Sequence, residues 1–477
     1  MKLKTLLPFC LVVAAQTGCR SSGPKNPLAE PEPPPAVLVD WREYFADERL
    51  RALISQALEG SPDLEAVSQR LRGAQAGLVA ADGALRPVVE AVAGASMRRF
   101  GRYTMDGAGN AGTLIIGDET VPVDLPDYRL GFQANWELDL WGRLRNLRAA
   151  AVSRLAAARE EICLVRTSLI AALAEAYYSF LGLDESRALI EDMIAVQYGA
   201  LDTIREQRRI GMANELSVRQ FEADLDRLQA LLVEVELAKI QQEAAFNFLL
   251  GRPAGSIERS AAPVEAWVLP ELEVVLEPAS LLNRPEVRIA EHRLVAADAD
   301  VEAARAAFLP SLSLGATLGL QAFRPELLSR ADSFAYSVGG DLVGPLFNRA
   351  AIEALLEAAR AEQAEALVLY KQAIIAGLLE VDQQLRSSRQ LAEGYAIKAR
   401  QVSKLTEAVE AAGELFRSGS ASYLELLTVQ QAALEARLEL VEWRRRQVTA
   451  SIGLYRALGG GSRGLDGDHG EPVRGST

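Results

Sequence analysis

The sequence predicts a mainly α-helical protein with two pairs of short β-strands, in which one unit is built twice. The first observation is a set of seven landmarks that recur at nearly matched intervals: Pro62, Pro87, Gly142, Arg143, Gly211, Leu250 and Gly251, then Pro285, Pro310, Asn348, Arg349, Gly419, Leu458 and Gly459. The second is a hydrophobic period that changes from helical to two after Pro87 and again after Pro310. The third is a long proline-free stretch at the end of each copy. Together they indicate short strands that lead into giant helical hairpins.

The N-terminal residues have the pattern of a secretory signal, predicted over residues 1–18. Lys2 and Lys4 supply its charge, and an apolar core with small residues leads to Cys19. A cysteine directly after Gly18 resembles a lipoprotein signal, in which Cys19 is lipidated. Gln16 stands where that signal usually has an aliphatic residue, so an ordinary signal peptide remains the alternative. Residues 19–36 then form a Pro-rich linker.

Composition excludes several classes of function. The chain has 477 residues, a net charge of −13, three cysteines and two histidines. The basic excess of a nucleic-acid-binding protein is missing. A metal or haem site built from His and Cys is improbable. No nucleophile–base constellation or phosphate loop is present, so we expect no catalytic residues, no metal and no cofactor.

The helices follow from the spacing of proline and glycine. Proline is tolerated at the start of a helix and stops it at the end, and glycine suits the turn between two helices. The first repeat (37–251) is expected to hold a long helix over about 143–210 and a return helix over about 214–250. The second repeat (284–459) is expected to hold the same pair over about 349–418 and 421–458. A linker (252–283) joins the repeats, and residues 460–477 form a flexible tail.

Alternation of apolar and polar residues predicts four strands, over about 88–97, 130–140, 312–321 and 334–342. In the clearest strand the apolar side chains of Leu130, Phe132, Ala134, Trp136, Leu138 and Leu140 share one face. Gln133, Asn135, Glu137 and Asp139 share the other, and would line water. Strands of about ten residues can cross a tilted bilayer. A soluble sheet with one wet face is the alternative.

The loop between the strands of each pair differs in length between the copies. Pro87 and Gly142 are 55 positions apart, whereas Pro310 and Asn348 are 38 apart, so the first copy has 17 extra residues. Insertions of this kind belong in exposed loops. Four membrane strands cannot close a barrel, and an open strand edge cannot face lipid, so several chains must combine. Two chains would give eight strands and a filled interior, and three would give twelve strands and room for an aqueous lumen.

Three segments carry a resemblance to a known family: LGFQANWELDLWGRLRNLRAA at 130–150, LVGPLFNRAAIEALLEAARAEQAEA at 342–366 and FRSGSASYLELLTVQQAALEA at 416–436. The chain resembles the TolC-like outer-membrane factors over roughly residues 37–460, and its signal is similar to that of the lipoprotein branch that serves tripartite efflux pumps. The resemblance implies a homotrimer with a twelve-stranded β-barrel in the outer membrane, continuous with a periplasmic α-helical barrel. It further implies a passive exit duct that receives substrate from an inner-membrane pump through a periplasmic adaptor.

The resemblance also implies roles for residues at the two hairpin turns. An acidic ring that narrows the tunnel corresponds here to Glu425 and to Thr428, which departs from the family pattern because it is not an acid. Adaptor docking is expected at both turns: Gly211, Asn214, Glu215, Gly419, Ser420 and Ser422. Two other functions remain open, namely a periplasmic coiled-coil scaffold or adaptor without a pore, and the exit duct of a type I protein secretion system.

Overall fold

The computed structural model describes residues 40–116, 118–260, 263–267, 282–347, 349–418 and 420–460, all within one compact unit, Leu38–Thr477. The expected signal, the lipidation site at Cys19, the Pro-rich linker, much of the connecting segment 252–283, most of the C-terminal tail and Gly419 lie outside the described residues.

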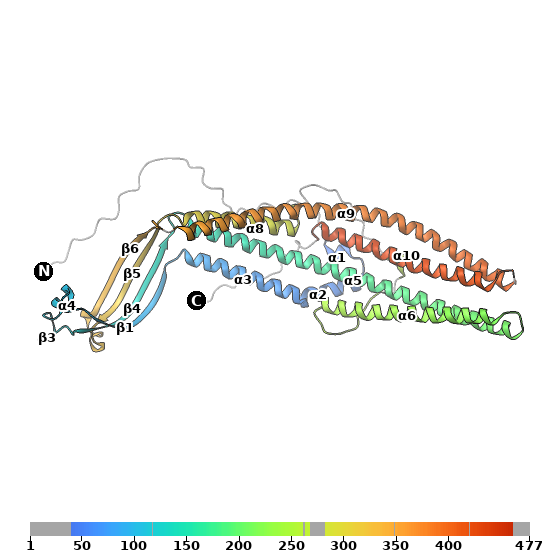
Figure 1. Cartoon of the computed structure of the whole chain (residues 1–477), viewed down its shortest axis with the longest axis horizontal. Coiled ribbons are helices and arrows are strands. Elements are labelled where there is room, and N and C mark those ends of the chain that lie inside the picture. The colour runs from blue at the N-terminus through green and yellow to red at the C-terminus, as the bar shows by residue number, and fades with distance from the viewer. Residues whose placement is uncertain are drawn as a thin grey trace, which may run out of the picture. The chain divides into compact units, whose positions relative to one another are not determined.

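Each repeat contributes a helix before its strands, a long helix after them and a return helix. In the first repeat these are α3 (Pro62–Ala84), α5 (Arg143–Arg209) and α6 (Glu215–Leu249); in the second they are α8 (Pro285–Ala306), α9 (Ala350–Arg417) and α10 (Tyr423–Ala457). The long helix α5 has 67 residues, which correspond to about 100 Å. It packs against α3, α6, α8 and α10, whereas α9 packs against α8 and α10 (Figure 1). None of the helices in the described residues is long and apolar enough to cross a membrane.

Four strands form one antiparallel sheet: β1 (Val88–Arg99), β4 (Asp124–Leu138), β5 (Ser311–Ala322) and β6 (Phe334–Val343). Their order is β1-β4-β5-β6, so the pairing of β4 with β5 joins the two repeats. The strand expected over 130–140 begins earlier, at Asp124, and ends at Leu138. The edge strands β1 and β6 each keep one side without a partner strand in the described residues.

The expectation that Asp139 lines water on the polar strand face is wrong. The residue lies beyond the end of β4, where its carboxylate accepts hydrogen bonds from the backbone N–H groups of Leu144 (3.0 Å) and Arg145 (2.9 Å). The first N–H groups of a helix have no partner within the helix. Gly142 adopts a left-handed φ of 81° and supplies no side-chain cap to α5, so Asp139 satisfies these groups instead.

Within the sheet the register places the expected apolar side chains on one face; Leu140, which was expected among them, lies beyond the end of β4. Phe132 faces Leu318, which faces Tyr336, and Ala134 faces Ala316, which faces Val338. Phe132 is 60% exposed and Tyr336 is 74% exposed. Apart from the short turn Ala331–Ser333, no helical element of the described residues packs extensively on the sheet. The described part of the chain therefore presents a broad apolar sheet face that none of its own helices covers.

Two short helices near the N-terminal end of the described chain connect the two repeats. The sequence did not reveal them. These are α1 (Trp41–Tyr44) and α2 (Glu48–Gly60). Tyr44 stacks on Tyr455 of α10 at 4.5 Å between ring centroids and donates a hydrogen bond to the Ser451 carbonyl (2.8 Å). Asp47 accepts a hydrogen bond from Tyr177 of α5 (2.8 Å). This segment thus joins the long helix of one repeat to the return helix of the other.

The extra residues of the first strand connection have secondary structure of their own. They include α4 (Met105–Asn110), β2 (Leu114–Ile116) and β3 (Glu119–Thr120), and β2 pairs with β3 in an antiparallel ribbon. The shorter connection of the second repeat contains two 3-10 turns, η2 (Pro325–Leu327) and η3 (Ala331–Ser333). Both connections lie at the sheet end away from the long helices (Figure 1).

A pair of glycines allows β4 and β5 to approach closely at the seam between the repeats. Gly131 and Gly319 face each other on the polar side of the sheet. A Cβ atom added to Gly131 would lie 2.6 Å from the Cα of Gly319 and overlap the Leu318 carbonyl oxygen, and a Cβ on Gly319 would meet the Gly131 Cα at 2.7 Å. Glycine within a strand often marks such a close backbone approach.

We predict that Gly131→Ala or Gly319→Ala lowers stability by about 1–3 kcal/mol, because the added methyl group must push two backbones apart. The measurement is thermal unfolding of the purified protein followed by circular dichroism. Gly339→Ala in β6 is the matched control, since its Cβ would meet nothing within 4 Å. Equal melting temperatures for all three variants would contradict the close-approach argument.

Candidate functional site

The polar face of the sheet is the first candidate site. One row across the strands contains Glu90, Gln133, Thr317 and Ser337, and another contains Glu137, Ser313 and Asp341. The Thr317 and Ser337 hydroxyls lie 2.7 Å apart, and Glu137 accepts two hydrogen bonds of 2.8 Å from Arg143 at the start of α5. These two rows are polar, as expected for a surface that borders water, although Val88, Val92 and Val343 also lie on this face.

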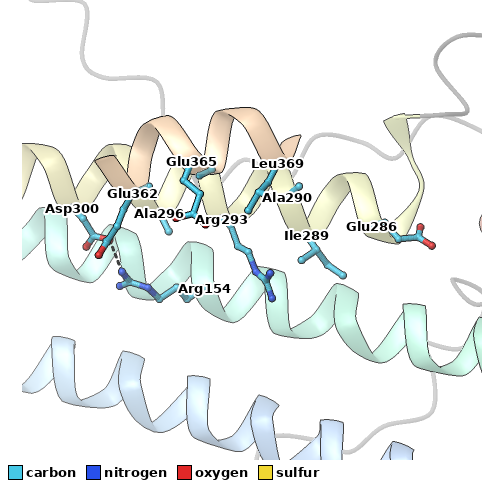
Figure 2. Close-up of a pocket in the computed structure, with 12 residues that line it drawn as sticks. Arg154, Glu286, Ile289, Ala290, Arg293, Ala296, Asp300, Glu362, Glu365 and Leu369 are labelled. Carbon is cyan, nitrogen blue, oxygen red and sulfur yellow. Dashed lines mark hydrogen bonds and ion pairs between the residues drawn. The ribbon is translucent and has the colours of Figure 1, made fainter. Parts of the chain in front are cut away.

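A hollow of about 530 Å³ lies between α5, α8 and α9. Figure 2 shows Arg154 of α5 in an ion pair with Asp300 of α8, with Glu362 of α9 nearby. Burial raises the pKa of Asp300 above its usual value, and Glu362 adds to this while Arg154 opposes it. Another lining residue, Arg293, pairs with Glu161 of α5 (2.6 Å). These ion pairs tie neighbouring helices together across the hollow.

The turn of the first hairpin is closed by Gly211, whose φ of 81° is the left-handed conformation that glycine adopts readily. The Met212 N–H donates to the Gln207 carbonyl at 2.8 Å, which is the hydrogen bond of a Schellman motif. Asn214 caps α6 by accepting from the Ser217 N–H (2.9 Å). Glu215 forms ion pairs with Arg208 and with Arg219 (3.1 Å). The charges at this turn are therefore largely paired.

The turn of the second hairpin is built in the same way with different side chains. The Ser420 N–H donates to the Leu415 carbonyl at 2.8 Å, which matches the bond that Met212 makes in the first turn. Ser422 is the N-cap of α10. Ser420 and Ser422, two of the residues expected to dock an adaptor, therefore lie at the hairpin end and also have structural roles there.

Glu425 lies in a capping box with Ser422. The Ser422 N–H donates to the Glu425 carboxylate at 2.7 Å, and the Glu425 N–H donates to the Ser422 hydroxyl at 3.3 Å. The backbone N–H and hydroxyl of Ser422 lower the pKa of Glu425 below its usual value, so the carboxylate stays charged. Thr428 donates its hydroxyl to the Leu424 carbonyl of its own helix (2.7 Å). The Ser-x-x-Glu pattern could have revealed this cap in the sequence.

Two contacts between the hairpins, which we call the latch, were missed by the sequence analysis. Tyr423 of α10 donates a hydrogen bond to Gln220 of α6, and Gln431 of α10 donates one to Asp224 of α6 (2.6 Å). Asp224 is buried and also accepts from Arg227 (2.9 Å). These residues lie more than 200 positions apart in the sequence, so no local pattern could pair them.

A small apolar core lies beside the latch, and we call it the tip cluster. Its buried members come from α5 and α6: Leu201, Ile204, Val218, Phe221 and Leu225. Phe416 of α9 and Tyr423 of α10 pack against it, and the rings of Phe221 and Tyr423 lie 6.2 Å apart. The tip cluster therefore holds the ends of both hairpins of one chain together.

In the residues that the structure describes, His, Cys, Asp and Glu side chains form no group of three or more that could hold a metal ion.

Comparison with known proteins agrees with this arrangement. The family model described as outer membrane efflux protein matches residues 53–252 and 277–460, one range in each repeat. The chain is 30% identical to the pyoverdine export outer membrane protein OpmQ of Pseudomonas putida, over 88% of each chain. It is 25% identical to the cation efflux system protein CusC of Escherichia coli, over 96% of this chain and 99% of CusC.

Solved structures share the fold. A crystal structure of CusC superposes with a TM-score of 0.79 at 25% identity, covering 89% of this chain and 95% of CusC. The outer membrane protein VceC of Vibrio cholerae gives a TM-score of 0.78 at 25% identity, covering 88% and 98%. The chain therefore belongs to the outer membrane efflux protein family, and it is an outer-membrane efflux channel that extends into the periplasm.

Proposed function

We propose that this chain forms a homotrimeric, passive exit duct for a tripartite efflux system. The observation that carries the proposal is the sheet: one apolar face without cover, one polar face, and two open edges. Lipid would cover the apolar face, and the polar face would line water. The proposal gives the chain no catalytic role and no cofactor.

Closure by three copies is supported at the sheet edges and along the helices. An antiparallel order of four strands lets β6 of one copy pair with β1 of the next, which gives twelve strands and satisfies both edges. Among the helices, α9 exposes a set of aliphatic side chains: Leu355, Val368, Ile375, Leu378 and Leu379. Helix α6 exposes a second set: Val233, Leu237 and Ile240. The helices α9 and α6 pack against different neighbours, α8 and α10 for the former and mainly α5 for the latter. A second copy would cover both surfaces.

The domain boundaries follow from the same plan. The two ranges matched by the family model support a first repeat at 37–251, a second at 284–459 and a connecting segment at 252–283. Lipidation of Cys19 belongs to the same proposal, because an acyl chain there would anchor the chain to the membrane that the sheet enters.

The hairpin turns would serve as the periplasmic end of the duct. Gly211, Asn214, Glu215, Gly419, Ser420 and Ser422 would receive a periplasmic adaptor, which connects the duct to an inner-membrane pump. Glu425 and Thr428 would face the narrowed opening. The capping box limits how far the Glu425 carboxylate can reach, since it is already held by Ser422.

We assign the selection of the exported substrate to the inner-membrane pump and the periplasmic adaptor. The relatives are named for pyoverdine export and for cation efflux, although they share one fold. We therefore favour an efflux partner without naming its substrate. A scaffold without a pore would not need the uncovered apolar sheet face, and type I protein secretion would be recognised by a different inner-membrane partner.

The proposal is tested by inserting the purified protein into planar bilayers and crosslinking it in intact cells. We expect discrete channel currents, a crosslinked trimer, and co-purification of an adaptor and a pump. Recovery as a soluble monomer without channel activity would overturn the duct.

In the same bilayers we predict that Glu425→Ala weakens the block of current by divalent cations added on the side of the hairpin turns. A ring of three carboxylates attracts cations at close quarters. Unchanged block would remove Glu425 from the gate and leave it the capping role alone.

The latch generates a separate prediction. The double variant Tyr423→Phe, Gln431→Met removes two hydrogen bonds between the hairpins. The bond to the charged Asp224 is alone worth about 1.5–3 kcal/mol. We expect the open state in bilayers to become about tenfold more populated. Thr203→Val is the matched control, because the Thr203 hydroxyl donates only within its own helix, to the Gly199 carbonyl (2.9 Å). An unchanged open probability in the double variant would show that the latch does not hold the duct closed.

A further inference from the structure

Two glutamine side chains are buried between the helices close to the latch. Gln197 of α5 is fully buried, and neither its carbonyl oxygen nor its amide nitrogen has a hydrogen-bond partner among the described residues. Gln430 of α10 is also buried, and its Oε1 has no partner there. Buried side-chain amides are normally paired, so two incomplete ones in the same region are unusual.

The two amides lie at nearly the same level along the hairpins. Tyr198, the neighbour of Gln197, accepts a hydrogen bond from Gln229 of α6 (3.0 Å), which places Gln197 at the level of Gln229. Gln431, the neighbour of Gln430, donates to Asp224 of α6. Asp224 and Gln229 are separated by five residues of one helix, or about 7.5 Å. Measured along the hairpin axis, the levels of Gln197 and Gln430 therefore differ by less than about two helical turns. We call this level the amide joint.

The amide joint interrupts the apolar packing of the long helix at the tip cluster. On the side of the turns, α5 contributes Leu201 and Ile204 to that cluster, and Ile194 packs on it from the other side of Gln197. Towards the sheet, Leu189 of α5 already packs on a much larger core, whose buried members run from Leu181 back to Leu169. The two cores are separate among the described residues, and Gln197 lies within the part of α5 that packs on the tip cluster. The ends of the hairpins are thus a distinct packing unit.

The chemistry of the amide joint favours separation of the helices. A buried donor or acceptor without a partner loses its hydrogen bonds with water and gains none in return. When the helices part and water enters, each amide recovers those bonds. The closed arrangement is consequently disfavoured at this level, and the latch and the tip cluster act against that tendency. A switch between two states requires interactions that favour each state, and here the unpaired amides favour the open state while the latch and the tip cluster favour the closed one.

We propose that the amide joint of Gln197 and Gln430 is the built-in break point at which the ends of the two hairpins separate when the periplasmic end opens. The inference rests on the proposed function, because it assumes that these ends form a gate. It assigns Gln197 and Gln430 to the opening motion, while the latch residues hold the closed state.

The test replaces each amide by an unbranched apolar side chain of similar length. In Gln197→Met and Gln430→Met the closed state no longer contains the unpaired groups. We expect opening of the hairpin ends to become about tenfold less frequent, seen as about tenfold slower amide hydrogen exchange in residues 198–222 and 423–436 of the full-length protein in detergent. Exchange in the remainder of α5, residues 143–190, should not change.

Gln447→Met is the matched control. Gln447 is a buried glutamine of α10, the helix that also carries Gln430, and both its oxygen and its nitrogen form hydrogen bonds. It accepts from Arg444 (3.1 Å) and donates to the Leu391 carbonyl (3.2 Å). Its replacement should accelerate local exchange around residue 447, the opposite sign from the other two variants.

The outcomes separate this inference from the proposed function. Unchanged or faster exchange at the hairpin ends in both Gln197→Met and Gln430→Met would overturn the amide joint. Slower exchange in either folded variant supports it, provided that the Gln447→Met effect has the opposite sign; the same sign in all three would also overturn it. Bilayer recordings are made in parallel. Failure of the wild-type protein to form channels would refute the duct, whereas the exchange result would still report on the joint.

Discussion

The sheet formed by β1, β4, β5 and β6 imposes the constraint on which the other features depend. Its register aligns the apolar side chains of four strands on one face, and nothing else in the described part of the chain covers that face. In water such a surface would drive association, and the open edges of β1 and β6 would offer unpaired backbone groups. A bilayer on one face and further copies at both edges remove both problems. The membrane location and the need for several chains thus have one physical origin.

The long helices extend this plan away from the membrane. Ion pairs join α5 to its neighbours at several levels, including Arg154 with Asp300 of α8 and Arg187 with Glu236 of α6 (2.7 Å). Partly exposed pairs of this kind contribute little each, so they orient the helices more than they stabilise them. The buried Arg284 is different: it donates to the Ala457 carbonyl at the end of α10 (2.7 Å) and to Glu380 of α9 (2.5 Å). It fixes the position of three elements of the second repeat.

The two hairpins have similar backbones and dissimilar ends. The first turn carries paired charges around Glu215, whereas the second is rich in serine and holds the Glu425 carboxylate in a cap. Links between them are few, and they lie beside buried amides that have incomplete hydrogen bonding. Strong packing around the middle of α5 and weaker packing at the turns would confine motion to the end where a duct has to open.

The sequence by itself determined the duplication, the long helices, the four strands and the face on which the residues within those strands lie. The end of β4 is the exception, since Asp139 lies beyond it. These features depend on local period and on the backbone preferences of proline and glycine, which act over a few residues. It placed Glu425 at the second turn but did not reveal its capping role, although the Ser422–Glu425 spacing contained that information. Only the tertiary structure decided that Gly131 faces Gly319, that Tyr423 reaches Gln220 and that Gln197 is buried without a partner. Those relations join residues from different helices or strands, and they are set by how the two repeats pack, which no local pattern encodes.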